Sequence, residues 1–235
     1  MNDLLARLRT DLAASANEEN CLKYARFFKE PVLYYGVSQP ELQKIQRAYW
    51  PEVQALRRPE AYRLFEALLA ADYSEEAFLV AAWLPRMKAE FERKDLPLFK
   101  RWIDRYLNNW AKVDSFCNHT LAEFLERYPG AVTEIAAWTR SKNRWMQRAA
   151  AVSLILPVRR GEYLAEAFAI AEALRESRDD MVQKGYGWLL KEASREHQQE
   201  VFDFVVARKA VMPRTALRYA IELMPKDLKA EAMKK

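Results

Sequence analysis

The segment "DDMVQKGYGWLLKEA" at residues 179–193 belongs to a pattern that occurs three times in the second half of the chain. The related segments are "NRWMQRAAAVSLILP" at 143–157 and "VMPRTALRYAIELMP" at 211–225. Each begins at a polar residue or near a proline, and a basic residue is then followed by small and apolar residues. The basic residues are Arg148, Lys184 and Arg218, so the spacings from 148 to 184 and from 184 to 218 are 36 and 34 residues. This period predicts helix pairs that stack as an α-solenoid.

The composition also favours helices. The chain has 235 residues, of which 51% are hydrophobic and 30% charged, as in globular proteins. It has only 5 glycines and no Asn-Gly or Asp-Gly hairpin signal, and helical periodicity fits almost everywhere. Pro40, Pro59 and Pro97 lie near the starts of amphipathic stretches, where helices tolerate proline. We therefore expect an all-α fold, a single α-solenoid domain of HEAT-like helical repeats over residues 1–235, forming a right-handed superhelix with a concave basic groove.

Several classes of protein are disfavoured. No apolar run approaches the roughly 20 residues that span a bilayer, and the N-terminal "MNDLLARLRTDLAASA" lacks the apolar core of a secretory leader. Cys21 and Cys117 are far apart, which indicates reduced thiols in a cytosol. His119 and His197 are the only histidines, so we expect no metal site.

The repeating position carries a charge pattern that the bulk composition does not reveal. The net charge is only +5, which is weak evidence for an anionic partner. A step of 34 residues back from Arg148 reaches Asp114, so the position reads as one acid and then three bases: Asp114, Arg148, Lys184 and Arg218. If these side chains line the groove, it suits a phosphate backbone. The alternative is that the basic residues bond to neighbouring helices, and the sequence leaves both open.

Two tryptophans stand beside charges on predicted helix faces. Trp110 and Asp114 are four residues apart, so they share a face. The same spacing relates Lys184 to Trp188 and Arg144 to Arg148. Aromatic faces attract cations and planar bases, at roughly 1–3 kcal/mol per stacked base. Core packing is the alternative for Trp110 and Trp188, and we predict it for Trp50, Trp83, Trp102 and Trp138.

Five segments resemble motifs of one family. "NNWAKVDSFCNHTL" at 108–121, "NRWMQRAAAVSLI" at 143–155 and "MVQKGYGWLLKEA" at 181–193 resemble those of the AlkD-type DNA alkylation repair family. These proteins are alkylpurine DNA glycosylases built of HEAT-like repeats. The resemblance extends to residues 27–45 and 212–225, so it covers almost the whole chain. No single segment is specific, but the set in this order is.

The resemblance implies roles for individual residues. Asp114 matches the catalytic aspartate of the family. Trp110 and Trp188 match the tryptophans that contact the deoxyribose and backbone of the lesion nucleotide, and Arg148 matches an arginine that engages DNA there. The other DNA-binding candidates are Ser38, Gln39, Arg144, Lys184 and Arg218. The sequence departs from the family at Phe27, often Tyr, and at Ser38, often Gln, with Gln39 one place later; these departures bear on lesion preference.

The chemistry is consistent with these roles. Alkylation at N3 or N7 gives a purine a positive charge and makes it a good leaving group. A carboxylate such as Asp114 then has only to stabilise the oxocarbenium-like sugar and position water. Lys112 lies two residues away on another face, so a lyase step through an imine is disfavoured. We expect a monofunctional glycosylase that acts on double-stranded DNA containing alkylated purines, and the resemblance implies that it acts without base flipping.

The resemblance also implies a monomer in the bacterial cytoplasm, at the nucleoid when acting, with no cofactor, metal or membrane partner. One alternative is a non-catalytic HEAT-repeat protein that binds branched or damaged DNA. Another is a scaffold for protein interactions, as most solenoids are.

Overall fold

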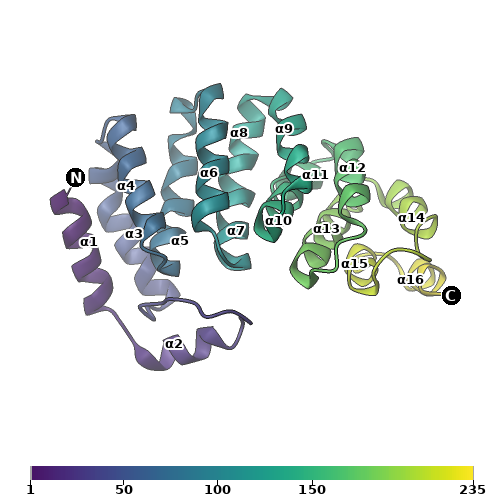
Figure 1. The fold of residues 1–235 in the computed structure, drawn as a ribbon, viewed down its shortest axis with the longest axis horizontal. Helices are drawn as coiled ribbons and strands as arrows, with labels where there is room; N and C mark the ends of the chain where they lie inside the picture. The colour runs from purple at the N-terminus through teal and green to yellow at the C-terminus, as the bar shows by residue number, and fades with distance from the viewer. Residues whose placement is uncertain (1, 235) are drawn as a thin grey trace. The chain divides into compact units, whose positions relative to one another are not determined.

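The computed structural model describes residues 2–234 (Figure 1). The chain folds into two compact units, Met1–Phe116 and Cys117–Lys235. Within the described residues all regular elements are helical, and an isolated bridge joins Leu33 to Tyr73. The predicted all-α fold of helical repeats is confirmed. The single domain, the handedness of the superhelix and the concave groove stay predictions.

The first unit contains seven α-helices and two 3-10 segments among its described residues. They are α1 (Asn2–Ala14), α2 (Glu18–Ala25), α3 (Gln39–Gln54), α4 (Arg58–Ala70), α5 (Ser74–Trp83), η1 (Leu84–Glu90), η2 (Arg93–Asp95), α6 (Leu96–Tyr106) and α7 (Trp110–Phe116). The helices α3, α4 and α6 begin at the predicted prolines, because proline fits the first turn, where its missing N–H is not needed.

The second unit begins with a π-helical turn and continues as short helices. Its elements are η3 (Cys117–Leu121), α8 (Ala122–Arg127), η4 (Pro129–Ala131), α9 (Val132–Ala136), η5 (Ala137–Arg140), α10 (Arg144–Val152), α11 (Ile155–Arg159), α12 (Leu164–Leu174), α13 (Asp180–Ala193), α14 (Gln198–Val206), α15 (Arg214–Ala220) and α16 (Lys226–Met233). The three repeated segments form α10, α13 and α15, as predicted.

These three helices lie side by side (Figure 1). Side-chain caps start two of them, since Asn143 accepts the N–H of Trp145 and Asp179 accepts those of Met181 and Val182. Gly187 allows α15 to approach α13 closely, because a Cβ at this position would lie 2.7 Å from the Cβ of Tyr219. Small residues in the repeat therefore set the helix spacing.

The tryptophans divide as the sequence predicted, with one exception. Trp83 and Trp102 are fully buried, and Trp138 is buried as well. Trp50 is only partly buried, so the prediction that it is a core residue is wrong. The guanidinium of Arg86 lies 3.9 Å from the centre of its ring, so a cation–π contact covers part of the indole at the surface.

Candidate active site

Helix α7 carries Trp110 and Asp114 on a face that is not part of the core. The helix buries Lys112 and Val113, whereas Trp110 and Asp114 are partly exposed. The two side chains lie one turn apart, as the spacing of four residues predicted. Of the two interpretations of Trp110, the structure disfavours a place in the hydrophobic core.

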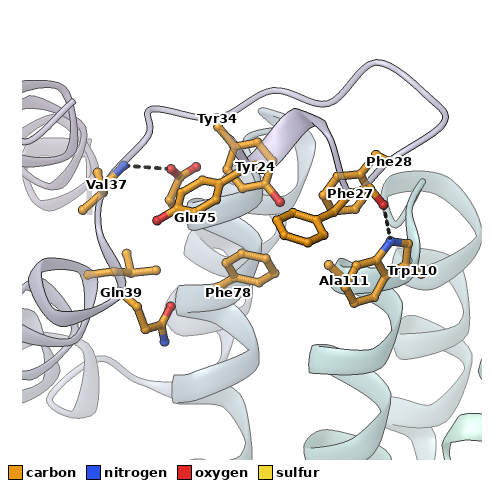
Figure 2. Close-up of a pocket in the computed structure, with 11 residues that line it drawn as sticks. Tyr24, Phe27, Phe28, Tyr34, Val37, Gln39, Glu75, Phe78, Trp110 and Ala111 are labelled. Atoms are coloured by element: carbon orange, nitrogen blue, oxygen red, sulfur yellow. Dashed lines mark hydrogen bonds between the residues drawn. The ribbon is translucent and has the colours of Figure 1, made fainter. Parts of the chain in front are cut away.

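The indole of Trp110 is held by the segment that follows α2. Its Nε1 donates a hydrogen bond to the carbonyl oxygen of Phe27 at 3.4 Å (Figure 2). The ring of Phe28 stacks on the indole with centroids 5.3 Å apart and planes inclined by 16°. Trp110 is therefore oriented by residues more than 80 positions away in the sequence.

Trp110 also lines a cavity of about 250 Å³ within the first unit (Figure 2). Six aromatic side chains form much of its wall: Tyr24, Phe27, Phe28, Tyr34, Phe78 and Trp110. Phe27 is 66% exposed, an unusual position for a large apolar side chain. Sequence reasoning missed this cavity, although the pairs "FF" at 27–28 and "YY" at 34–35 were a signal.

A buried carboxylate fixes the loop behind this aromatic wall. Glu75, at 2% exposure, accepts the backbone N–H groups of Tyr35, Gly36 and Val37 at 3.2, 2.8 and 3.2 Å. Burial raises the pKa of Glu75, and the bonds from the backbone oppose that rise. Gly36 has φ of +82°, and a Cβ there would lie 2.0 Å from the carbonyl oxygen of Asn17, so the tight loop requires glycine.

Two further candidates lie at the start of α3. The hydroxyl of Ser38 accepts the N–H of Glu41 at 3.4 Å and caps the helix. Gln39 is exposed and lines the same cavity as Trp110. Ser38 thus has a structural role, and the predicted DNA contacts of both residues stay predictions.

Trp188 and its neighbours lie in the second unit. Trp188 is partly exposed on α13, and its Nε1 donates to Glu192 Oε1 at 3.2 Å. Lys184, one turn earlier, forms a 2.8 Å ion pair with Asp180. The two indoles thus belong to different units, and their convergence on one sugar stays a prediction.

Arg148 is buried on α10, with 5% of its surface exposed. Its guanidinium donates to the carbonyl oxygen of Met181 at the start of α13. Its side chain passes close to Gly185, where an added Cβ would lie 3.3 Å from Arg148 Cγ. The structural alternative for this arginine, bonding to a neighbouring helix, is therefore observed. Its contact with DNA stays a prediction.

The remaining basic candidates differ in exposure. Arg144 pairs with Asp179 at 3.1 Å and lies 4.5 Å from the ring centre of Trp145. Arg218, on α15, is exposed. Arg144 thus contributes to the α10 and α13 junction, whereas Arg218 presents its charge to solvent.

Hydrogen bonds to two residues of the first unit hold the amine of Lys112. Its Nζ donates to the carbonyl and to Oδ1 of Asp72, both at 2.6 Å, and to Asn108 Oδ1 at 3.1 Å. Burial lowers the pKa of Lys112, and the Asp72 carboxylate opposes that effect. The amine is directed to the turn after α4, which agrees with the prediction that it points away from Asp114.

The described residues 2–234 include no cluster of three or more His, Cys, Asp or Glu side chains able to hold a metal ion. Over the same range, no helix is both long and apolar enough to cross a membrane.

Comparison with solved structures shows the fold. A predicted DNA alkylation repair enzyme from Enterococcus faecalis superimposes with a TM-score of 0.81 at 17% identity, over 90% of this chain and 98% of that one. The Pseudomonas fluorescens alkylpurine DNA glycosylase AlkC, bound to DNA containing an abasic site analog, gives a TM-score of 0.58 at 17% identity. That match covers 98% of this chain and 64% of AlkC.

Sequence comparison shows the family. None of the curated proteins matches the chain. The model of the family described as DNA alkylation repair enzyme matches residues 8–224, nearly the full length. The chain therefore belongs to the DNA alkylation repair enzyme family.

Proposed function

We propose that the protein is a monofunctional DNA glycosylase that hydrolyses the N-glycosidic bond of cationic N3- or N7-alkylated purines in double-stranded DNA. Family membership supports a role in DNA alkylation repair. The observation that carries the assignment is the pairing on α7, where the carboxylate of Asp114 and the indole of Trp110 share a partly exposed face.

The proposed chemistry requires little from the protein. An alkylated purine with a positive charge departs without protonation, and bond cleavage transfers the charge to the sugar. The Asp114 carboxylate stabilises that oxocarbenium-like sugar and orients a water molecule toward its anomeric carbon. The indole faces of Trp110 and Trp188 add cation–π attraction to the same charge.

The proposal includes hydrolysis without a lyase step and without base flipping. An imine intermediate needs a free amine near the sugar, and the Lys112 amine is engaged by Asp72 and Asn108. A substrate that carries its own charge needs no pocket to bind and activate its base, so the lesion can stay stacked while the enzyme acts from the backbone side. Basic residues of the second unit, among them the exposed Arg218, supply phosphate contacts.

The test is release of the base from a duplex containing N7-methylguanine. The wild type is expected to excise it, whereas Asp114→Asn is expected to lose at least about 100-fold in rate, comparable to loss of one preorganised electrostatic contact. Both proteins should melt at the same temperature. The matched control is Asp104→Asn, an exposed aspartate on α6, which should excise at the wild-type rate.

Equal rates for wild type and Asp114→Asn would refute the assigned catalytic role. Tight binding of damaged or branched DNA with no release of base by the wild type would instead establish the non-catalytic DNA-binding alternative. If the wild type neither excises base nor binds alkylated DNA in preference to unmodified DNA, the remaining interpretation is a scaffold for protein interactions.

A further inference from the structure

Glu192 is a carboxylate with an unusual position on α13. It lies one turn after Trp188, is 3% exposed, and accepts the Trp188 indole N–H at 3.2 Å. An ionised carboxylate buried to this degree is costly unless other groups compensate it.

Two arginines provide that compensation. Arg159, on α11, donates its Nε to Glu192 Oε2 at 2.9 Å, and Arg195, just after α13, donates its Nε to the same oxygen at 2.6 Å. Burial favours the neutral acid, but the bonds from Arg195, Arg159 and Trp188 outweigh it and lower the pKa of Glu192. The group that receives the indole N–H is therefore a negative charge, with Oε1 left to the tryptophan.

We propose that Glu192 is a positioning residue for Trp188, which fixes the orientation of the indole and makes its face more attractive to a cationic sugar. The inference rests on the proposed function. A hydrogen bond to an ionised acceptor is stronger than one to a neutral acceptor, so it restricts the ring. It also polarises the indole toward higher electron density, and the attraction of a cation to an aromatic face is electrostatic.

Trp110, the other indole of the proposed site, provides an internal comparison. Trp110 donates to a neutral main-chain carbonyl, that of Phe27, and stacks on Phe28. Backbone contacts cannot be removed by a side-chain substitution, whereas the contact of Trp188 can. Loss of Glu192 is therefore expected to affect one of the two indoles and to leave the other unchanged.

The first variant is Glu192→Gln, which preserves shape and a hydrogen-bond acceptor but removes the charge. We expect a single-turnover excision rate about 10-fold lower than wild type, with unchanged affinity for abasic-site DNA. The matched control is Glu172→Gln on α12, which removes a carboxylate paired with Arg208 at 2.6 Å and Arg175 at 2.7 Å. That variant should keep the wild-type rate.

A double-mutant cycle separates positioning from general stability. Trp188→Phe retains an aromatic ring but has no N–H to donate. If Glu192 acts through the indole, Glu192→Gln causes no further loss of rate in the Trp188→Phe background. Independent, multiplying losses would overturn the inference, as would an equal loss of rate in the Glu172 control.

A readout independent of excision keeps the two proposals apart. In protein labelled with 5-fluorotryptophan, the ¹⁹F resonance of Trp188, assigned from its absence in Trp188→Phe, should shift or broaden in Glu192→Gln. The resonance of Trp110 should not change. An unaltered Trp188 resonance in Glu192→Gln would overturn the positioning role. A shifted resonance in Glu192→Gln together with a wild type that excises no base would refute only the proposed function.

Discussion

Substitution of Gly187 by Ala tests the helix spacing in the second unit. The new Cβ would lie 2.7 Å from the Cβ of Tyr219 and 2.8 Å from the carbonyl oxygen of Ala216. Both atoms belong to or adjoin the backbone of α15, so no side-chain rotation relieves the contact. The helices α13 and α15 would have to move apart, which exposes apolar surface between them.

Two opposing effects determine how much unfolding free energy Gly187→Ala should lose. Overpacking of a well-packed core costs about 1–3 kcal/mol, and the backbone position of the contact places this case near the upper end. Replacement of Gly by Ala inside a helix returns about 1 kcal/mol. The net loss of unfolding free energy is then about 2 kcal/mol, which lowers the melting temperature by about 4–8 °C for a chain of this size.

The assay is thermal unfolding followed by circular dichroism or calorimetry, with Gly130→Ala as the control. A Cβ at Gly130 would meet nothing within 4 Å, so that variant should melt at or slightly above the wild-type temperature. A Gly187→Ala protein as stable as the wild type would show that α13 and α15 are not in close contact and would refute the packing argument.

Three further predictions concern activity and pH. Trp110→Ala and Trp188→Ala should slow excision of poorly reactive lesions more than of N7-methylguanine, because a less stable leaving group places more demand on the sugar contacts; equal losses across lesions in single-turnover assays would argue against that role. Lys184→Ala and Arg218→Ala should each reduce the slope of log Kd against log salt by about one phosphate contact with little change in chemistry, and an unaltered slope would assign them structural roles. The pKa of His197 is raised by a hydrogen bond from its ring to a main-chain carbonyl, and a glutamate adds to this effect, so its protonated form stabilises the fold. That stability is fully present below pH 6.5 and is lost as the pH rises through the raised pKa. His197→Ala should therefore make the urea midpoint depend less on pH above 6.5 than it does in the wild type.

The fold class could be predicted because it depends on local chemistry. Apolar residues at helical spacing, prolines at helix starts and the recurrence of Arg148, Lys184 and Arg218 specify helices and their stacking within short segments. Trp110 and Asp114 could be placed on one face for the same reason, since four residues make about one turn.

The environment of each site residue could not be predicted, because it depends on groups that are distant in sequence. The sequence left open whether Arg148 faces a groove or a neighbouring helix, and only the structure shows it buried against Met181 and Gly185 on the next repeat. Nothing near Trp110 indicated that the carbonyl of Phe27 holds its indole. These contacts form only when helices stack.

For Glu192, local sequence spacing determines one property and tertiary structure another. Its position one turn after Trp188 can be read from the sequence, and the same spacing occurs at many surface glutamates. Only the tertiary structure decided that it is buried, because α11 brings Arg159 to the carboxylate and supplies part of the charge that offsets desolvation. Local spacing thus determined which helix face each residue occupies, whereas packing between helices decided burial and partners, because these depend on chain segments that meet only in the folded state.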